Sequence, residues 1–342
     1  MTPSFKTLAT AAVLGVCSSA WAQNSVSVYG LIDLSAGQFQ NAGQTKIWRE
    51  DSGNMATSYL GFKGVEDLGG GLKAKFALES FLRADNGAYG RFGGDNFWTR
   101  AAWVGLEGGF GTVSAGRTTN QFFLSTLLFN AFGDSFGYSP SIRQFLTPST
   151  GMPWYGDTGW SNSVLYQSPK FGGVSINLQG ALGEGAANAT GPSYGGNVIY
   201  FGGGFGATFA YQHVEKDTST PPPAGFEDQT SLQLGLSYDF GPVKLFAQLA
   251  QITTNKTDED ETTAWGIGAS IPVGAGKILV QYNEAEADFG AAGTADVTNK
   301  TLTAGYDYFL SKRTDLYAVY MNDKMTGKNT GNTWAVGMKH TF

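Results

Sequence analysis

The sequence contains one cysteine, Cys17, and only two histidines, His213 and His340, among 342 residues. The histidines lie far apart and belong to no metal-spacing motif, and no glycine cluster ends in the Gly-Lys-Ser/Thr of a phosphate-binding loop. No signature of a serine hydrolase, with its Ser–His pair held by a third group, is visible either. We therefore predict that the chain is not an enzyme and uses no metal or cofactor.

No stretch reaches the roughly 20 apolar residues of a membrane-spanning helix. The longest apolar run, residues 8–16, follows Lys6 and precedes Ala20-Trp21-Ala22. A charged, an apolar and a small-residue region in this order are typical of a secretory signal peptide. We predict a signal peptide over residues 1–22 and a mature chain over 23–342. Cleavage would remove Cys17, which excludes disulfides and cysteine metal sites from the mature protein.

An excess of positive charge is also missing. Without Lys6, the only charged residue of residues 1–22, 21 basic residues face 28 acidic ones, a net charge of −7. Nucleic-acid binding depends on neutralising phosphates with basic patches. The charge balance therefore predicts no nucleic-acid partner.

Glycine and aromatic residues, by contrast, are abundant, with 49 Gly, 24 Phe, 15 Tyr and 8 Trp. Glycine-rich or polar turn sequences recur at intervals of mostly 32 to 40 residues, which leaves room for two strands of about ten residues, a long loop and a short turn. The seven turn sequences begin at residues 66, 106, 168, 201, 239, 271 and 308. Seven short turns on one side predict sixteen strands if the first and last strands pair.

The segments between the turns alternate between apolar and polar residues. In residues 231–240, Leu232, Leu234 and Leu236 share one face, and Gln233 and Ser237 share the other. A soluble sandwich and a membrane barrel both give this period of two. The strand lengths suit a bilayer crossing, short turns and long loops sort to opposite ends, and Tyr and Phe gather near strand ends, as in the aromatic girdles of membrane barrels. We predict a transmembrane barrel.

Barrel closure explains the alternating final segment, residues 332–342. A spanning sheet cannot leave an unpaired edge in hydrocarbon, because each unsatisfied backbone group costs several kcal/mol. The last strand, which ends at Phe342, is therefore expected to pair with the strand that begins at Ser25.

The stretches "SVSVYGLIDLSAG", "LGFKGVEDLGGGLKAKFALES", "AAWVGLEGGFGTVSAGR" and "SNSVLYQSPKFGGVSINL", with the terminal Phe342, resemble the general diffusion porins of Gram-negative outer membranes, in particular the neisserial and betaproteobacterial branch. The resemblance covers the whole mature chain. It implies an all-β, 16-stranded antiparallel transmembrane β-barrel with short periplasmic turns and long extracellular loops. It also implies a homotrimer whose terminal phenylalanine is read by the outer-membrane assembly machinery.

One interval, of about 62 residues, exceeds the others, and its surplus lies over residues 118–160. In similar porins the third long loop folds into the barrel and sets the size limit of the lumen, so we expect a constriction loop here. This segment is rich in aromatic residues. They could pack the loop against the barrel wall, or some could face the pore and favour flat solutes by stacking.

Charged side chains at the constriction set the ion preference of such a pore. Alternation places basic residues on the lumen face, and a lipid-facing arginine near the midplane would cost about 2–4 kcal/mol. The candidate pore-lining residues are Lys73, Lys75, Arg83, Arg100 and Arg117 on strands, and Asp134, Arg143 and Asp157 on the loop. Of three arginine positions familiar in similar porins, only Arg100 is retained. Tyr59 replaces one and Gly159-Trp160 the other, so we predict weak ion selectivity.

The sequence thus predicts an outer-membrane channel for passive diffusion of small hydrophilic solutes and ions. Two alternatives remain, a substrate-preferring channel with an aromatic binding track and a barrel that acts mainly as a surface adhesin or receptor. Outer-membrane lipid and lipopolysaccharide are the expected surroundings. The acidic cluster at residues 255–263 fits a solvated external loop, with weak cation-mediated contact to lipopolysaccharide as the alternative.

Overall fold

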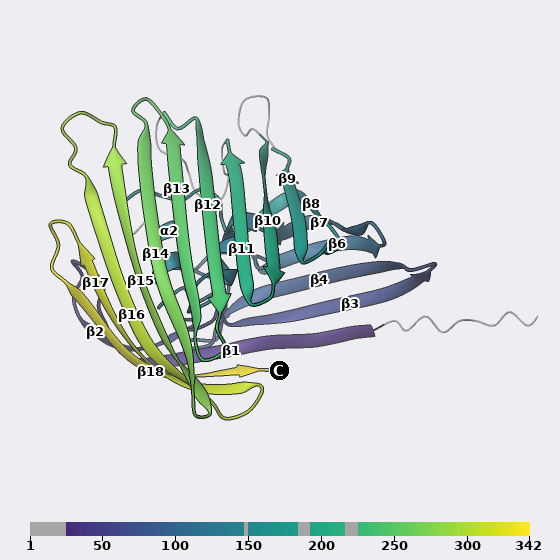
Figure 1. Cartoon of the computed structure of the whole chain (residues 1–342), viewed down its shortest axis with the longest axis horizontal. Helices are drawn as coiled ribbons and strands as arrows, with labels where there is room; N and C mark the ends of the chain where they lie inside the picture. The colour runs from purple at the N-terminus through teal and green to yellow at the C-terminus, as the bar shows by residue number, and fades with distance from the viewer. Residues whose placement is uncertain (1–24, 147–149, 184–191, 216–224) are drawn as a thin grey trace, which may run out of the picture.

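The computed structural model describes residues 25–146, 150–183, 192–215 and 225–342. The expected signal peptide, residues 1–22, lies outside the described residues. Within the described part, none of the helices has the length and apolar character needed to cross a membrane. Most of the chain forms a single antiparallel sheet (Figure 1).

Sixteen strands make up the wall of this sheet, which confirms the predicted count. Fifteen of them are single segments, and one consists of β2 and β3, which pair with the second and the first half of β1. The short β5 pairs only with the end of β4. The strands are β1 (Ser25–Phe39), β2 (Ile47–Ser52), β3 (Tyr59–Gly69), β4 (Leu72–Arg83), β5 (Ala88–Tyr89), β6 (Ala101–Gly108), β7 (Gly111–Thr119), β8 (Gly159–Gln167), β9 (Val174–Ala181), β10 (Ser193–Gly202), β11 (Phe205–Val214), β12 (Asp228–Asp239), β13 (Lys244–Asn255), β14 (Asp260–Val273), β15 (Gly276–Phe289), β16 (Val297–Phe309), β17 (Thr314–Met325) and β18 (Gly331–Thr341).

The last strand closes the sheet onto the first, as the terminal alternation predicts. β18 runs antiparallel to β1, with pairs from Leu31 opposite Thr341 to Gln38 opposite Trp334. Gly30 and Phe342 extend this pairing by donating backbone hydrogen bonds to each other, at 3.2 and 3.1 Å. A Cβ at Gly30 would fall 2.5 Å from the Phe342 ring, so a larger residue at this position would clash with the ring. Closure leaves no free edge, as a spanning sheet requires.

The distribution of polar and apolar side chains over the two faces of the wall is the reverse of that in a soluble β-barrel. In β12, Leu234, Leu236 and Tyr238 are exposed on the outer face, whereas Gln233 and Ser237 are buried on the inner one. The same contrast recurs around the barrel. An apolar outer face and a polar inner face suit a wall between lipid and an aqueous lumen.

The segment between β7 and β8 folds back against the inner face of the wall. Its helices are α1 (Gln121–Leu128), which packs on β9 to β12, and α2 (Pro140–Phe145), which packs on β14 to β16. Figure 1 shows α2 behind the strands of the wall. Thr126 and Gln144 bond the inward-facing Gln233 and Asn299, at 3.1 and 2.8 Å. We call residues 120–158 the inner segment; residues 147–149 of it lie outside the described part.

Most aromatic side chains of the inner segment pack against the wall. Fully or nearly buried rings are Phe122, Phe123, Phe129, Phe132, Tyr138, Phe145 and Tyr155. Phe136 and Trp154 are only partly buried. Packing against the wall therefore accounts for most of these aromatic residues. In the described part of the inner segment, only Phe136 and Trp154 remain as rings that could face the lumen.

Candidate functional site

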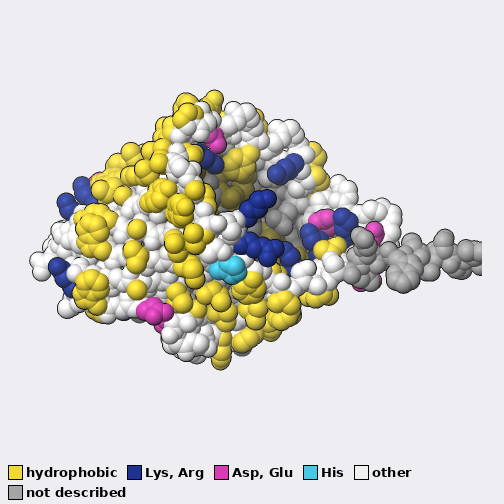
Figure 2. Space-filling model, turned by 90° about the horizontal axis from the view of Figure 1, so that it is seen from below, with side chains coloured by type: hydrophobic (Ala, Val, Ile, Leu, Met, Phe, Trp, Pro, Cys, Tyr) yellow, Lys and Arg dark blue, Asp and Glu magenta, His cyan; other side chains and the backbone are white. Residues whose placement is uncertain are grey.

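The inner segment covers the neutral side of the lumen and leaves a basic side open. The covered strands present amide and hydroxyl side chains, such as Gln233, Gln281 and Asn299. The opposite side, formed by β3, β4 and the start of β6, carries cations on its inward face. We call this cluster the basic wall; its members are Lys63, Lys73, Lys75, Arg83 and Arg100. Seen from below, the molecule is hollowed, with Lys and Arg side chains gathered around the hollow (Figure 2).

Arg100 is the centre of the basic wall. Its guanidinium lies 2.6 Å from the Glu79 carboxylate and stacks over the Tyr59 ring at 4.0 Å. The Tyr29 hydroxyl donates a short hydrogen bond to the same carboxylate. The ring and the carboxylate hold the guanidinium in one orientation, and the carboxylate offsets its charge toward ions in the lumen.

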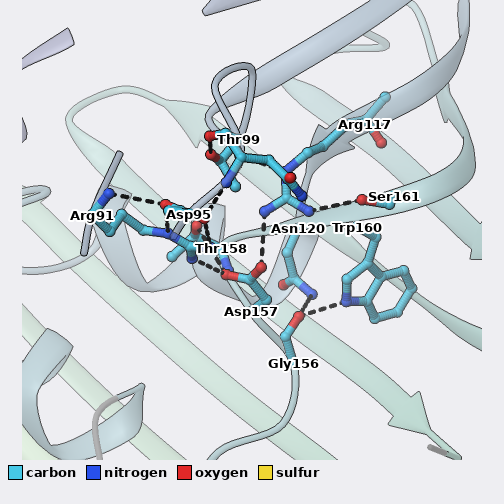
Figure 3. Close-up of polar contacts among 12 residues, drawn as sticks. Arg91, Asp95, Thr99, Arg117, Asn120, Gly156, Asp157, Thr158, Trp160 and Ser161 are labelled. Carbon is cyan, nitrogen blue, oxygen red and sulfur yellow. Dashed lines mark hydrogen bonds and ion pairs between the residues drawn. The ribbon is translucent and has the colours of Figure 1, made fainter. Parts of the chain in front are cut away.

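Arg117 lies where the pairing of β7 with β8 shifts register, between Gly116 and Thr118. A bulge of this kind re-aims a side chain. Its guanidinium bonds the Asp157 carboxylate at 2.8 Å and the Ser161 hydroxyl at 3.0 Å (Figure 3). The bulge thus ties β7 to the end of the inner segment.

Arg91, on the loop between β5 and β6, shares the same carboxylate. It bonds Asp157 at 2.6 Å and Asp95 at 3.0 Å (Figure 3). Burial acts to raise the pKa of Asp157, but the Arg117 and Arg91 charges hold it below its ordinary value. Asp157 therefore differs from the expectation. It does not oppose the basic residues from across the pore but forms ion pairs with two of them.

The other candidates fall outside this centre. Lys73 and Lys75 pair with Glu107, at 3.7 and 2.7 Å, near the short turn that joins β3 to β4. Arg143 extends from α2 to Asp323 on β17, at 3.4 Å. Lys73 and Lys75 therefore lie at the turn end of the basic wall, away from Arg100, and Arg143 lies outside the basic wall.

Asp134 is a carboxylate near the middle of the inner segment. Burial raises the pKa of Asp134, and the charges of Arg100 and Lys339 act in the opposite direction. Asp134 is thus within electrostatic reach of the Arg100 guanidinium, although no ion pair joins the two within the described residues.

Arg83, unlike Lys73, Lys75 and Arg100, has no acidic partner within the described residues. Within the described residues, no carboxylate lies within ion-pair distance of its guanidinium. One of its nitrogens donates to the Tyr89 carbonyl at 3.3 Å, and its Nε has no hydrogen-bond partner in the same part of the chain.

Sequence reasoning missed Glu79, Arg91 and Asp95. Glu79 shares the alternating face of Lys73 and Lys75, so its lumen position could have been read from the strand pattern. Arg91 and Asp95 lie in an irregular loop without periodicity. Among the described residues no cluster of three potential metal ligands occurs.

Comparison with known proteins identifies the family. The family model for Gram-negative porins matches residues 9–328. The outer membrane porin protein 32 of Delftia acidovorans is 35% identical over 91% of this chain and 87% of that protein. This chain belongs to the Gram-negative porin family. Major outer membrane protein P.IB of Neisseria meningitidis serogroup B is 28% identical over 94% of this chain and 95% of that protein.

A solved structure agrees with the assignment. The anion-selective porin from Comamonas acidovorans superposes with a TM-score of 0.78 at 27% identity and covers 94% of this porin and 100% of its own chain. The protein is an outer-membrane porin that forms a passive diffusion channel, and its relatives are channels rather than enzymes. The recognised family, the sixteen-stranded barrel and the outer-membrane location are thereby confirmed.

Proposed function

We propose that this porin is a weakly selective diffusion pore with a slight preference for anions. The observation that carries the proposal is the pairing of the lumen cations. Arg100 pairs with Glu79, Arg117 with Asp157, and Arg91 with Asp95 and Asp157. Paired charges largely cancel at the distance of a passing ion, so the field in the lumen is weak.

Two features support an anionic rather than a cationic preference. Arg83 and Lys63 have no ion pair within the described chain. Asp134 is the only carboxylate of the described inner segment without an ion pair, so unpaired cations outnumber it. A structural neighbour at 27% identity is named as anion-selective. Tyr59 in place of an arginine reduces the preference, because that position supplies a ring and no charge.

The test is conductance of the purified protein in a planar bilayer with a potassium chloride gradient. We expect discrete conductance steps and a small reversal potential of the sign that chloride permeation gives. A reversal potential close to that of full anion selectivity would contradict the weak field. No conductance from folded, heat-modifiable protein would show that the inner segment blocks the lumen, and would favour a surface adhesin or receptor.

We further propose a homotrimer in the outer membrane, with lipid and lipopolysaccharide around it and assembly through the machinery that reads Phe342. The family resemblance supports the trimer. The continuous apolar outer face supports contact with lipid. The trimer predicts conductance steps in groups of three and a high-mass band on an unheated detergent gel, which heating converts to the monomer.

A further inference from the structure

A recess of about 250 Å³ opens beside the basic wall, between the inner segment and the ends of β2 to β4. It is smaller than the roughly 300–1,000 Å³ of sites for drug-sized ligands. Its lining combines two aromatic rings, two guanidinium groups and hydroxyl groups. The side chains concerned are Phe81, Phe136, Arg83, Arg91, Ser58 and Thr158.

The two arginines of the recess are in different electrostatic states. Arg91 bonds two carboxylates, Asp95 and Asp157, so its charge is already compensated. Arg83 uses one of its five N–H donors, toward the Tyr89 carbonyl, and its Nε is buried without a partner. A guanidinium in this state has unused donors for a carboxylate, which it binds in a planar, two-pronged geometry.

The rings give the recess an apolar side. Phe81 is held in the wall, with the Arg91 and Arg100 guanidinium groups 5.8 Å from its ring centroid. Phe136 enters from the inner segment and packs against Phe123, 5.8 Å between centroids. Phe136 is one of the two rings of this segment that stay partly exposed, so it is available to a solute.

We propose that the recess is a subsite for small aromatic monocarboxylates, with the carboxylate on Arg83 and the ring against Phe136 and Phe81. The proposal deepens the proposed diffusion function and rests on it. The subsite would concentrate such solutes next to the narrow part of the lumen and slow the ions that pass it. Arg83 occupies none of the three arginine positions familiar in similar porins.

The test measures how benzoate reduces the single-channel potassium chloride current. In the unaltered porin we expect saturable block by benzoate. Acetate lacks the ring, cyclohexanecarboxylate lacks the flat ring and benzyl alcohol lacks the charge, so each should block more weakly. Equal block by benzoate and acetate, or by benzoate and benzyl alcohol, would overturn the proposal.

Two variants and a matched control assign the block to the recess. Arg83→Gln should raise the half-blocking concentration of benzoate at least about tenfold. Phe136→Leu should raise it by about two- to tenfold, the usual range for loss of an aromatic pair. Lys63→Gln removes a lumen cation outside the recess and should change it less than about twofold. Equal effects of Arg83→Gln and Lys63→Gln would show that the block depends on the overall charge of the lumen, and would overturn the proposal that benzoate binds in the recess.

Heat-modifiability on a detergent gel verifies folding of each variant. If Arg83→Gln fails to fold, the ligand series on the unaltered porin and the Phe136→Leu variant still decide the matter. Channels that conduct potassium chloride without benzoate block would contradict the subsite alone. Absence of any conductance from folded protein would contradict the diffusion function instead.

Discussion

At the scale of single residues, Glu79 sets the strength of the field in the lumen. Its carboxylate neutralises Arg100 at 2.6 Å and accepts the Tyr29 hydroxyl. Glu79→Gln keeps the shape and leaves the guanidinium charge uncompensated. A unit charge about 8 Å from an ion in water is worth about 0.5 kcal/mol, or about a twofold change in permeability. We therefore expect the chloride-to-potassium permeability ratio from reversal potentials to rise at least about twofold.

The control for this prediction is the same substitution on the outer face. Glu284 pairs with Lys300 at 3.1 Å, on the side of β15 and β16 that faces away from the lumen. Glu284→Gln should leave the reversal potential unchanged. A Glu79→Gln channel with the same permeability ratio as Glu284→Gln would mean that the Arg100 pair does not influence passing ions.

The sequence predicts which face a charge occupies better than which partner it meets. Alternation along residues 72–83 places Lys73, Lys75 and Arg83 on one face, and the pairing of β3 with β4 agrees. Partners come from distant segments and have no local signal. Arg91 and Asp157 are 66 residues apart, and Asp157 reaches the ion pair with a backbone φ of 46°. That left-handed conformation is uncommon for aspartate and cannot be read from composition.

At the scale of elements, the start of α1 anchors the inner segment. The Asn120 side chain caps the helix by accepting the Phe123 N–H at 2.9 Å. Its amide nitrogen donates to the Gln212 side chain on β11 at 2.8 Å and to the Gly156 carbonyl at 3.3 Å. One residue therefore holds the helix start, the barrel wall and the returning end of the segment together.

Replacement of Asn120 by alanine removes both the cap and the tether, whereas serine retains a capping oxygen but is too short to reach Gln212. Loss of a cap costs about 0.5–2 kcal/mol. We expect Asn120→Ala to lower the melting temperature and to increase current fluctuations of the open channel. Asn120→Ser should stay close to the unaltered stability but show part of the added noise. If Asn120→Ser is as quiet as the unaltered porin, the tether does not hold the segment.

Elements differ in how far their sequence determines them. The seven turn sequences all fall between paired strands, because glycine and turn residues act locally and the strands between them alternate with a strict period. The inner segment has no such period. Its two short helices form against inward-facing amides of strands that lie far along the chain, so their positions depend on the closed barrel. The register shift at Gly116 likewise depends on β8, which begins at Gly159.

At the scale of the whole molecule, the fold follows from the number of strands and the need to close. Sixteen alternating segments and an edge that cannot stay open in lipid allow the ring to be predicted before any contact is known. The selectivity of the pore does not follow in the same way. It arises from ion pairs such as Arg100 with Glu79 and Arg117 with Asp157, which exist only when the ring and the inner segment are both in place.

The way in which the barrel closes allows the contribution of Phe342 to stability to be measured apart from its role in assembly in the cell. Eight residue pairs join β1 to β18 from Leu31 to Gln38, and Phe342 adds its backbone bonds to Gly30. Phe342→Ala keeps that backbone pairing and removes only the ring. Because the pairs of the seam remain, the variant should refold in detergent with nearly the yield of the unaltered porin, measured by heat-modifiability.

In cells the outcome should differ, since we propose that the assembly machinery reads the Phe342 side chain. We expect Phe342→Ala to accumulate in the outer membrane in clearly smaller amounts. Met338→Ala is the matched control, because Met338 is an exposed apolar side chain of β18, four residues before Phe342. Equal amounts of the two variants in outer-membrane fractions would show that the ring carries no assembly signal. A Phe342→Ala chain that fails to refold in detergent would instead assign the ring to the stability of the seam.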